Sequence, residues 1–404
     1  MKVLQINTVF RNGGSTGRIA YDLMQIQEQE GIDAYVAYGY ETGNTYKENT
    51  FCLQSAIQRK INILRTRLFD HHGFYNEAET GKLIRWMDEV HPDIIHLHNI
   101  HNHYLNVKTL FDYIKQRDIP VVWTLHDCWS FTGHCAYFDF ANCDKWKSGC
   151  HDCPSLREYP STWFFDRTKR NYNDKKSVFT AVNNLTLVTP SEWLASLTRE
   201  SFLKDYPVEI INNGIDTDVF KPTVSDVKSK LGIEGRKMIL YVGQWHKRKG
   251  IEYLLKLPSL LSDDEILVVV GLKPQQLELL PKKNCLGITR TNNVEELTGL
   301  YSVADVFINP TLEDNFPTTN IEALACGTPI VTFETGGSVE AVDKKTGIVV
   351  SQGNLQSMLD AIRTVINRGN TYYEGNCRDK AIKEYNKDKQ YLKYIELYRR
   401  VLNK

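Results

Sequence analysis

The stretch MILYVGQWHKRKG, residues 238–250, places an apolar run directly before a glycine and a basic loop. An earlier stretch, KVLQINTVFRNGGSTGR at residues 2–18, repeats this plan with an apolar run, three glycines and two arginines. Buried parallel strands have continuous apolar runs of this kind, and the loops that follow them lead into crossover helices. Each stretch therefore predicts the first strand and loop of a Rossmann-like α/β domain.

Two series of apolar runs follow these openings, separated by helical patterns. The first series is KVLQIN, DAYVAYG, DIIHLHN, PVVWTLH and LTLVTPS, and the second is MILYVG, EILVVVG, DVFINP, PIVTF and GIVV. Such alternation predicts two parallel sheets in tandem. Between them, EIINNGIDTDVFKPTVSDVKSKLG replaces the apolar pattern with Gly, Pro and charge. We predict an N-terminal domain at 1–208, a C-terminal domain at 209–385, and a terminal helix at 386–404 that packs on the N-terminal domain.

Composition excludes several classes of protein. The 404 residues include 49 basic and 49 acidic side chains, so no net field favours nucleic acid. The N-terminus reads as a strand without the apolar segment of a signal peptide, and no apolar run has the length of a membrane span. These features predict a cytoplasmic protein that holds any anionic ligand by local geometry.

The stretch TLEDNFPTTNIEALACG, residues 311–327, places Asp314 and Glu322 on either side of a helix start. One interpretation is structural: Thr319 and Glu322 match a capping box, in which each side chain satisfies a backbone N–H of the first turn. The other is functional: the helix start binds an anion while the acids accept hydrogen bonds from hydroxyl groups beside it. The sequence of this stretch leaves both open.

Two loops match the second interpretation. Gly13, Gly14 and Gly17 let the backbone approach a ligand closely at a helix N-terminus, although a plain tight turn has the same glycines. Residues 247–249 are all cationic and follow a strand, which suits a diphosphate, although most surface charge runs are only solvated.

These motifs together resemble a known family. DNFPTTNIEALACGTP and VGQWHKRKG are similar to the donor-site motifs of the retaining GT-B glycosyltransferases of family 4. PDIIHLHNIHNHYLN, VVWTLHDCWSFTGHCAYF and PSEWLA resemble the bacterial exopolysaccharide branch that includes colanic-acid transferases. The resemblance implies an α/β, GT-B fold with two Rossmann-like domains facing each other across a cleft. It also implies sugar transfer from a nucleotide diphosphate sugar, with retention of configuration and without a catalytic metal.

By motif position, the resemblance gives catalytic roles to three residues: His126 faces the donor sugar, Asp314 contacts its hydroxyls and Lys249 binds phosphate. Glu322 would bind the ribose. Two departures stand out: the family's loop arginine is Gln244 here, and the first motif acid is an aspartate with Glu313 beside it. The implied donor site comprises Gly13, Gly14, Gly17, Gly243, Lys247, Arg248, Lys249, Asp314, Phe316, Pro317, Thr318, Thr319 and Glu322.

The histidine-rich segment HLHNIHNH suggests the acceptor side. Its residues His98, His101 and His103 follow a predicted strand and suit hydrogen bonding to an acceptor, with core packing and a metal site as alternatives. The resemblance implies a glycan or polyprenyl-diphosphate-linked acceptor.

Four cysteines, Cys135, Cys143, Cys150 and Cys153, have the spacing C-x7-C-x6-C-x2-C. The final C-x2-C is a typical half of a tetrahedral zinc site, which would brace a loop and not catalyse. Free thiols and disulfides are the alternatives.

The segment SAIQRKINILRTRLF places Ile57, Ile61, Leu64 and Leu68 on one helical stripe, with arginines and a lysine elsewhere. Most such helices pack their apolar stripe on a core. A basic amphipathic helix also suits peripheral contact with an anionic membrane, at the inner face of the cell membrane.

Three functions remain after this reading. A glycosyltransferase agrees with every motif. A catalytically silent sugar-nucleotide-binding subunit would need a damaged donor site, to which only Gln244 points, and a sugar-nucleotide epimerase should lack the acidic helix motif.

Overall fold

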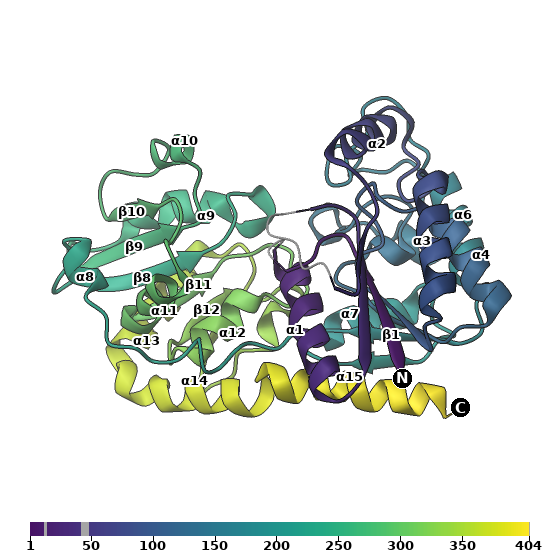
Figure 1. Cartoon of the computed structure of the whole chain (residues 1–404). Helices are drawn as coiled ribbons and strands as arrows, with labels where there is room; N and C mark the ends of the chain where they lie inside the picture. The colour runs from purple at the N-terminus through teal and green to yellow at the C-terminus, as the bar shows by residue number, and fades with distance from the viewer. Residues whose placement is uncertain (12–13, 42–47, 404) are drawn as a thin grey trace. The chain divides into compact units, whose positions relative to one another are not determined.

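The computed structural model describes residues 1–11, 14–41 and 48–403 (Figure 1). The chain divides into two compact units. Unit 1 comprises residues 1–212 and 391–404, and unit 2 comprises residues 213–390. The change of unit at 212–213 lies within the stretch where the sequence loses its apolar pattern.

Unit 1 is built on seven parallel strands in the order β3-β2-β1-β4-β5-β6-β7. The strand order reverses direction between β1 and β4, where the carboxyl ends of open α/β sheets bind ligands. The strands are β1 (Lys2–Asn7), β2 (Asp33–Tyr38), β3 (Thr50–Cys52), β4 (Ile94–Leu97), β5 (Val121–Thr124), β6 (Leu185–Thr189) and β7 (Val208–Ile210). The helices are α1 (Ser15–Gln29), α2 (Ala56–Phe69), α3 (Glu77–Val90), α4 (Val107–Arg117), α5 (Lys145–Ser148), α6 (Thr168–Phe179) and α7 (Glu192–Glu200).

Both faces of this sheet are buried. Leu4 and Ile6 pack in one core with residues of α3, α4 and α6. Figure 1 shows these three helices grouped together. Val3, which precedes Leu4, packs in a second core with α1 and with α15 (Lys387–Leu402). Successive strand residues point to opposite faces, so a sheet covered on both sides needs the continuous apolar runs seen in the sequence.

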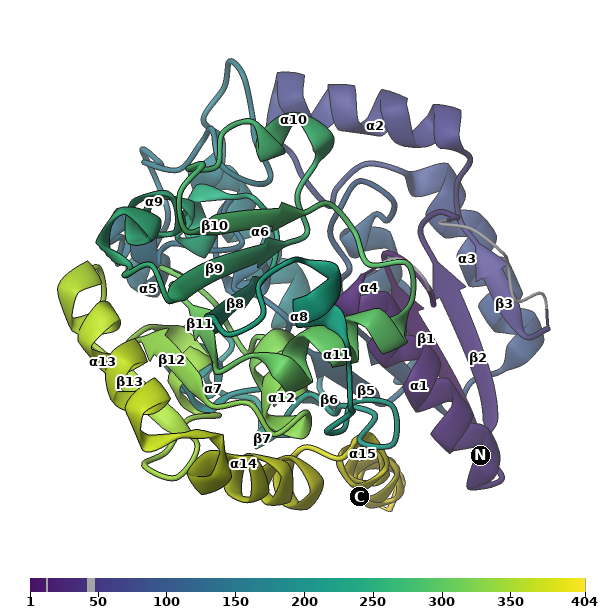
Figure 2. The same cartoon turned by 90° about the vertical axis from the view of Figure 1, so that its left-hand side faces the viewer.

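Unit 2 has six parallel strands in the order β10-β9-β8-β11-β12-β13, with helices on both sides (Figure 2). The strands are β8 (Lys237–Val242), β9 (Glu265–Val270), β10 (Cys285–Ile288), β11 (Val306–Asn309), β12 (Ile330–Phe333) and β13 (Gly347–Val350). The helices are α8 (Val227–Lys230), α9 (Ile251–Lys256), α10 (Pro274–Leu277), α11 (Val294–Val303), α12 (Thr318–Ala325), α13 (Leu355–Arg368) and α14 (Asn370–Glu384).

The last helix, α15, ends the chain in the core of unit 1. Tyr391, Tyr394 and Tyr398 are buried there beside α1 and the first strands. The Tyr398 hydroxyl accepts a hydrogen bond from Gln27 of α1 at 3.2 Å. Among the residues described, no helix combines the length and the hydropathy that crossing a bilayer would need.

Candidate functional site

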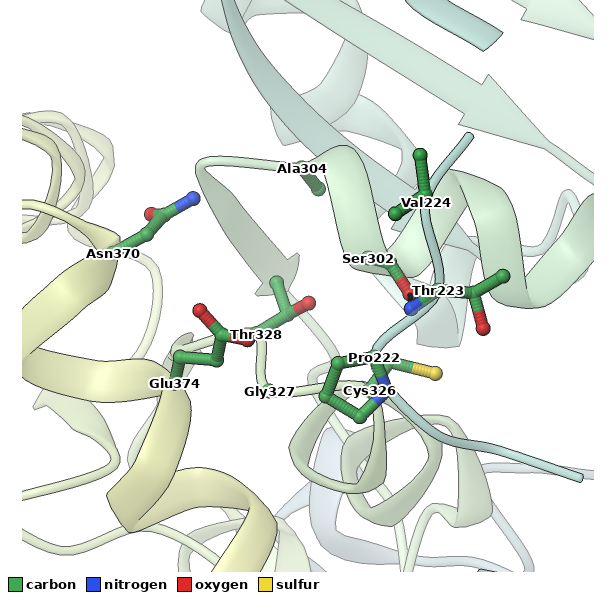
Figure 3. Close-up of a pocket in the computed structure, with 10 residues that line it drawn as sticks. All are labelled: Pro222, Thr223, Val224, Ser302, Ala304, Cys326, Gly327, Thr328, Asn370 and Glu374. Carbon is green, nitrogen blue, oxygen red and sulfur yellow. Dashed lines mark hydrogen bonds between the residues drawn. The ribbon is translucent and has the colours of Figure 1, made fainter. Parts of the chain in front are cut away.

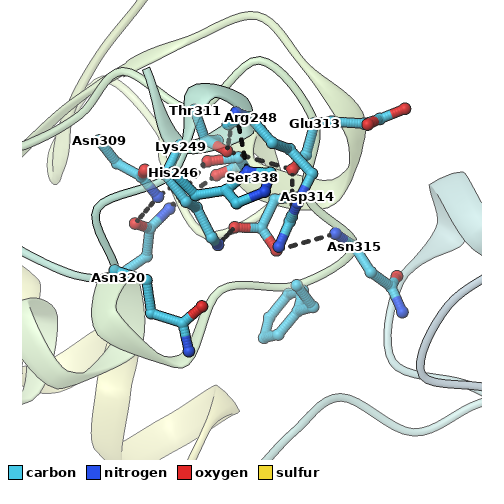
Figure 4. Close-up of polar contacts among 12 residues, drawn as sticks. His246, Arg248, Lys249, Asn309, Thr311, Glu313, Asp314, Asn315, Asn320 and Ser338 are labelled. Carbon is cyan, nitrogen blue, oxygen red and sulfur yellow. Dashed lines mark hydrogen bonds and ion pairs between the residues drawn. The ribbon is translucent and has the colours of Figure 1, made fainter. Parts of the chain in front are cut away.

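Two adjacent loops of unit 2 meet beyond the carboxyl ends of β8 and β11. The first contains the 3-10 turn η3 (Lys247–Lys249), and the second runs through residues 310–317. The Leu312 amide donates to the Arg248 carbonyl at 2.8 Å, and the Arg248 guanidinium donates to the Glu313 carbonyl at 2.6 Å (Figure 4). These hydrogen bonds join the basic loop at residues 247–249 to the acidic loop at residues 310–317, which were identified in the sequence as two separate motifs.

Lys249 and Asp314 form an ion pair at the centre of these loops (Figure 4). Burial lowers the pKa of Lys249, although the Asp314 carboxylate acts in the opposite direction. The second carboxylate oxygen of Asp314 accepts from the Asn315 amide at 3.1 Å. The structure therefore places side by side the cation predicted for phosphate and the acid predicted for sugar hydroxyls.

Two glycines permit this close approach of loops. Gly250 and Gly336 have φ angles of 76° and 49°, in the left-handed region. A Cβ atom at Gly250 would lie 1.9 Å from the Pro310 carbonyl oxygen, and one at Gly336 would lie 1.9 Å from the Asp314 carbonyl oxygen. Both positions therefore require glycine for steric reasons as well as for the backbone angle.

The capping-box interpretation of the acidic loop is wrong. Helix α12 begins at Thr318 after Pro317, which has no side chain able to cap it, so Thr319 lies inside the helix. Glu322 instead accepts a hydrogen bond from the Tyr301 hydroxyl at 2.9 Å. Pro317, at the N-cap, thus makes no side-chain hydrogen bond to the first turn of α12, and backbone N–H groups at such a helix N-terminus suit an anion.

A buried network of side-chain amides and hydroxyls joins α12 to the ends of β11 and β12. Asn309 at the end of β11 donates to the Asn320 side chain at 2.8 Å, and Asn320 donates to the Ser338 carbonyl at 3.0 Å (Figure 4). Ser338 in turn shares a 2.8 Å hydrogen bond with Thr332 of β12. This network could not be predicted from the sequence, because each of its residues alone is an ordinary polar residue near a strand end.

The glycine loop of unit 1 follows β1. Asn7, at the end of that strand, donates to the carbonyls of Val9 at 2.8 Å and Thr16 at 3.1 Å and so shapes the loop. Gly14 precedes α1 with φ 91°, and a Cβ there would meet no atom of the described residues within 4 Å. Gly17 packs where a Cβ would lie 3.2 Å from Val9. The predicted residue Gly13 lies outside the described residues.

His126 follows β5 and belongs to a chain of buried hydrogen bonds that determines its tautomer. Gln5 donates its amide to Gln27 at 3.0 Å, so its oxygen accepts from His98 Nε2–H at 3.1 Å. Burial keeps His98 neutral by lowering its pKa, so His98 Nδ1 has a lone pair and accepts from His126 Nε2–H at 3.2 Å. Burial also lowers the pKa of His126 to about 4, so His126 is a neutral Nε2–H imidazole near pH 7.

The other histidines of the predicted acceptor side differ in their partners. His101 contacts Asp127 at 2.9 Å and the Tyr159 hydroxyl at 3.0 Å. Burial alone would raise the pKa of Asp127, but His101 and the Trp129 amide lower it. His103 contacts Thr66 at 3.0 Å, and burial lowers its pKa to about 4.

Both ring nitrogens of His96 are occupied, by Tyr398 at 2.6 Å and by Thr124 at 2.8 Å. His98 is only 1% exposed, between Gln5 and His126. These contacts exclude the pairing of His96 with His98 around a metal in this arrangement. His98 is therefore shielded from solvent and contacts His126 directly.

The four clustered cysteines are free thiols. A hydrogen bond between Cys135 and Cys153 lowers the pKa of Cys153 to about 7 and raises that of Cys135. Cys150 accepts from the Gly133 amide at 3.1 Å. Within residues 1–11, 14–41 and 48–403, no three His, Cys, Asp or Glu side chains are placed to hold a metal ion. The thiols as placed do not fit a zinc site, and zinc at this loop stays a prediction.

A cavity of about 330 Å³ lies elsewhere in unit 2, beside residues that precede β11 and β12 (Figure 3). Its lining includes Ser302, Cys326, Thr328 and Glu374 and contains no lysine or arginine. It therefore lies at the amino ends of the strands, away from the paired loops, and lacks the cations that a diphosphate would require.

Two family models match the sequence. The model described as Glycosyltransferase Family 4 matches residues 13–219, slightly more than half of the chain. The model described as Glycosyl transferases group 1 matches residues 236–368, which include both loops of the unit 2 site.

Individual proteins agree with these matches. A chain named as the colanic acid biosynthesis glycosyl transferase WcaC of Escherichia coli is 26% identical over 416 aligned positions, covering 98% of this chain and 99% of WcaC. Among solved structures, sucrose-phosphate synthase from Thermosynechococcus elongatus has a TM-score of 0.72 at 17% identity, covering 100% of both chains. Anabaena HepE in complex with UDP-glucose has a TM-score of 0.67 at 16% identity, covering 98% of this chain and 99% of HepE.

At these identities the solved structures support the fold alone, and they agree with the two parallel sheets described above. The Glycosyltransferase Family 4 match includes Gly14, Gly17, His98 and His126 of unit 1. The Glycosyl transferases group 1 match includes Lys249, Asp314 and Glu322 of unit 2. The chain belongs to glycosyltransferase family 4 and has the GT-B fold.

Proposed function

We propose that this protein transfers a sugar from a nucleotide diphosphate sugar to a glycan or lipid-linked glycan, with retention of anomeric configuration, in bacterial surface polysaccharide synthesis. The observation that carries the proposal is the ion pair of Lys249 with Asp314, which lies in the loop that leads into α12, whose N-cap residue is Pro317. The similarity to WcaC, named for colanic acid biosynthesis, supports the polysaccharide assignment. The solved complex of HepE with UDP-glucose supports a nucleotide sugar as the donor.

In this proposal each group of the unit 2 site has one task. The first N–H groups of α12 and the Lys249 ammonium bind the diphosphate, because both are positive and partly shielded from water. Asp314 accepts hydrogen bonds from hydroxyls of the sugar. Glu322, oriented by Tyr301, accepts hydrogen bonds from the ribose hydroxyls.

Bond cleavage leaves negative charge on the departing diphosphate. Fixed donors and cations stabilise such charge without reorganising during the reaction. We propose that Lys249, its neighbours Lys247 and Arg248, and α12 supply this stabilisation and that no metal ion is required. Unlike the nucleotide sites that rely on Mg²⁺, the site then needs only groups that belong to the chain.

Retention follows if the acceptor attacks the face from which the diphosphate departs. The bond from the anomeric carbon to the phosphate oxygen breaks, the bond to the acceptor oxygen forms, and the acceptor proton passes to the departing phosphate oxygen. His126, as a neutral Nε2–H imidazole, suits a role beside the sugar and not that of a charged acid. The group of His101, Asp127 and Tyr159 suits the acceptor side, where we place a polyprenyl-diphosphate-linked glycan at the cytoplasmic face of the membrane.

Incubation of the whole protein with UDP, GDP, ADP and CDP sugars tests the proposal. We expect release of one nucleoside diphosphate that increases with membrane lipid acceptors, and a product whose anomeric proton coupling matches that of the donor. Inverted configuration would contradict retention. Binding of a nucleotide sugar without release of nucleoside diphosphate, with every acceptor tried, would support a catalytically silent subunit instead. Conversion of the nucleotide sugar to an epimer without transfer would support an epimerase.

A further inference from the structure

Helix α2 of unit 1 buries polar residues and exposes apolar residues together with cations. Asn62 and Thr66 are its buried residues, whereas Ile57, Ile61 and Leu64 are exposed by 72%, 53% and 49%. The expectation that the apolar stripe packs on a core is therefore wrong. A helix this apolar on its solvent side indicates a surface that binds a partner.

Polar contacts on the inner side hold the helix in this orientation. Asn62 donates to the Gln54 side chain at 3.2 Å, and Thr66 bonds to His103 at 3.0 Å. Rotating α2 to bury its isoleucines would break both hydrogen bonds and leave Gln54 and His103 without these partners. The outward direction of the apolar stripe is thus part of the fold of unit 1.

A second exposed apolar segment lies at the C-terminal end of α2. Trp163, Phe164 and Phe165 follow one another in a loop and are exposed by 41%, 71% and 49%. The Trp163 amide donates to the Arg67 carbonyl at 2.8 Å, and the Arg67 guanidinium lies 5.4 Å from the Trp163 ring centre. We define the docking face as Ile57, Ile61, Leu64, Trp163, Phe164 and Phe165.

The charges around the docking face identify its partner. Helix α2 contains four cations and no acidic residue, in a chain whose formal charge is zero. The nearest acid in the aromatic loop, Asp166, is turned to the protein, where it accepts from Thr168 and from the Cys153 amide at 2.7 Å. Two copies of such a face would repel each other, so a second copy of this chain does not fit it.

We propose that the docking face binds an anionic lipid bilayer, with α2 lying in the plane of the interface. Isoleucines, leucine and phenylalanine would enter the acyl boundary, Trp163 would lie at headgroup level, and the cations would contact anionic headgroups. The inference deepens the proposed function, since a lipid-linked acceptor would be met at that surface. Vesicle binding needs neither donor nor acceptor, so failure of sugar transfer would leave this proposal standing, and the reverse also holds.

Sedimentation of the full chain with vesicles tests the docking face. We expect binding to phosphatidylcholine vesicles that contain phosphatidylglycerol, little binding to phosphatidylcholine alone, and weakening by salt. The triple variant Ile57→Ser, Ile61→Ser and Leu64→Ser should lose about tenfold or more in binding, because it removes the inserted apolar groups. Lys60→Glu with Arg65→Glu should lose binding to anionic vesicles selectively.

The matched control is Leu277→Ser with Leu279→Ser, two exposed leucines of unit 2 that should leave binding unchanged. Thermal melting of each variant shows whether it is folded, and the loop variant Phe164→Ser keeps the test valid if the helix variants unfold. Equal sedimentation of the wild type and the triple variant would overturn the proposal. So would a wild-type dimer in light scattering that the triple variant converts to monomer, since the face would then pair two copies.

Discussion

Lys249 is a largely buried amine, 20% exposed, that forms an ion pair with Asp314. The family resemblance identified both residues by their positions in its motifs. Their contact could not be predicted, since the two residues are 65 positions apart in the sequence and meet because β8 and β11 are neighbours in the sheet. Tyr301 was missed for the same reason: only the packing of α11 against α12 brings it to Glu322.

Removal of the Lys249 cation should reduce catalysis more than folding. We expect Lys249→Ala to lower kcat/KM by about a hundredfold or more, because a fixed cation no longer meets the charge of the departing diphosphate. Steady-state kinetics with the preferred donor measure the loss. Lys283→Ala is the matched control, since Lys283 forms an exposed ion pair with Asp263 in the same unit. Equal activity in the two variants would remove Lys249 from the site.

The tautomer of His126 is a second residue-scale prediction. The hydrogen bonds from Gln5 through His98 require the proton of His126 to be on Nε2. Nitrogen-15 NMR of histidine-labelled protein near pH 7 should show a neutral His126 ring with a protonated Nε2. In the variant His98→Phe this acceptor is lost, so the fraction of His126 that is protonated on Nε2 should fall. A charged or Nδ1-protonated His126 in the wild type would contradict the relay.

At the scale of elements, all ten apolar runs that the sequence analysis named contain strands of the structure. The strands it missed are β3, β7 and β10, of three, three and four residues at the sheet edges. A short edge strand buries few side chains and leaves little apolar signal, so its pairing is determined by the neighbouring strand and not by its own sequence. The start of α12 was misread because Pro317 places the first helical residue at Thr318, one position before Thr319.

The turn η5 (Gly336–Val339) allows a paired prediction with an internal control. Gly336→Ala should reduce donor affinity and lower the melting temperature, because its Cβ would collide with the Asp314 carbonyl oxygen. Gly235→Ala has the same left-handed backbone, with φ 79°, but its Cβ would have no atom of the described residues within 4 Å. It should cost only the backbone strain of about 1–2 kcal/mol and leave donor affinity unchanged. Thermal melting and donor titration distinguish the two effects, and equal donor affinity in both variants would contradict the role of Gly336.

At the scale of the whole molecule, the histidines are distributed unevenly. His246 is the one histidine in the sequence of residues 213–390, and the other ten belong to unit 1. Burial lowers the pKa of His96 to about 3 and those of His103 and His126 to about 4. The sequence showed the clustering of histidines but not their burial, which for His96 depends on contacts with Tyr394 and Tyr398 of α15.

Acid should therefore destabilise unit 1 before unit 2. An unfolded histidine binds a proton near pH 6.5, whereas the buried ones bind it near pH 3 to 4. Between these values the unfolded state holds more protons, so the free energy of unfolding falls as pH falls, by up to about 1.4 kcal/mol per pH unit for each histidine. Hydrogen exchange at pH 7 and pH 5, corrected for intrinsic rates, should show lost protection in β4 and β5 and a smaller change in β8 and β11. An equal loss in both sheets would contradict this reading.

The central claim is that unit 2 binds the diphosphate and the ribose of a nucleotide sugar through Lys249 and Glu322. Thermal melting with UDP, GDP, ADP and CDP tests it most directly, because a ligand that binds only the folded state raises Tm. We predict that at least one of these nucleotides raises the Tm of the wild type, and that the shift is lost in Lys249→Ala and in Glu322→Ala. The claim would be contradicted if none of the four nucleotides changed the Tm of the wild type. It would also be contradicted if both variants showed the same Tm shift as the wild type.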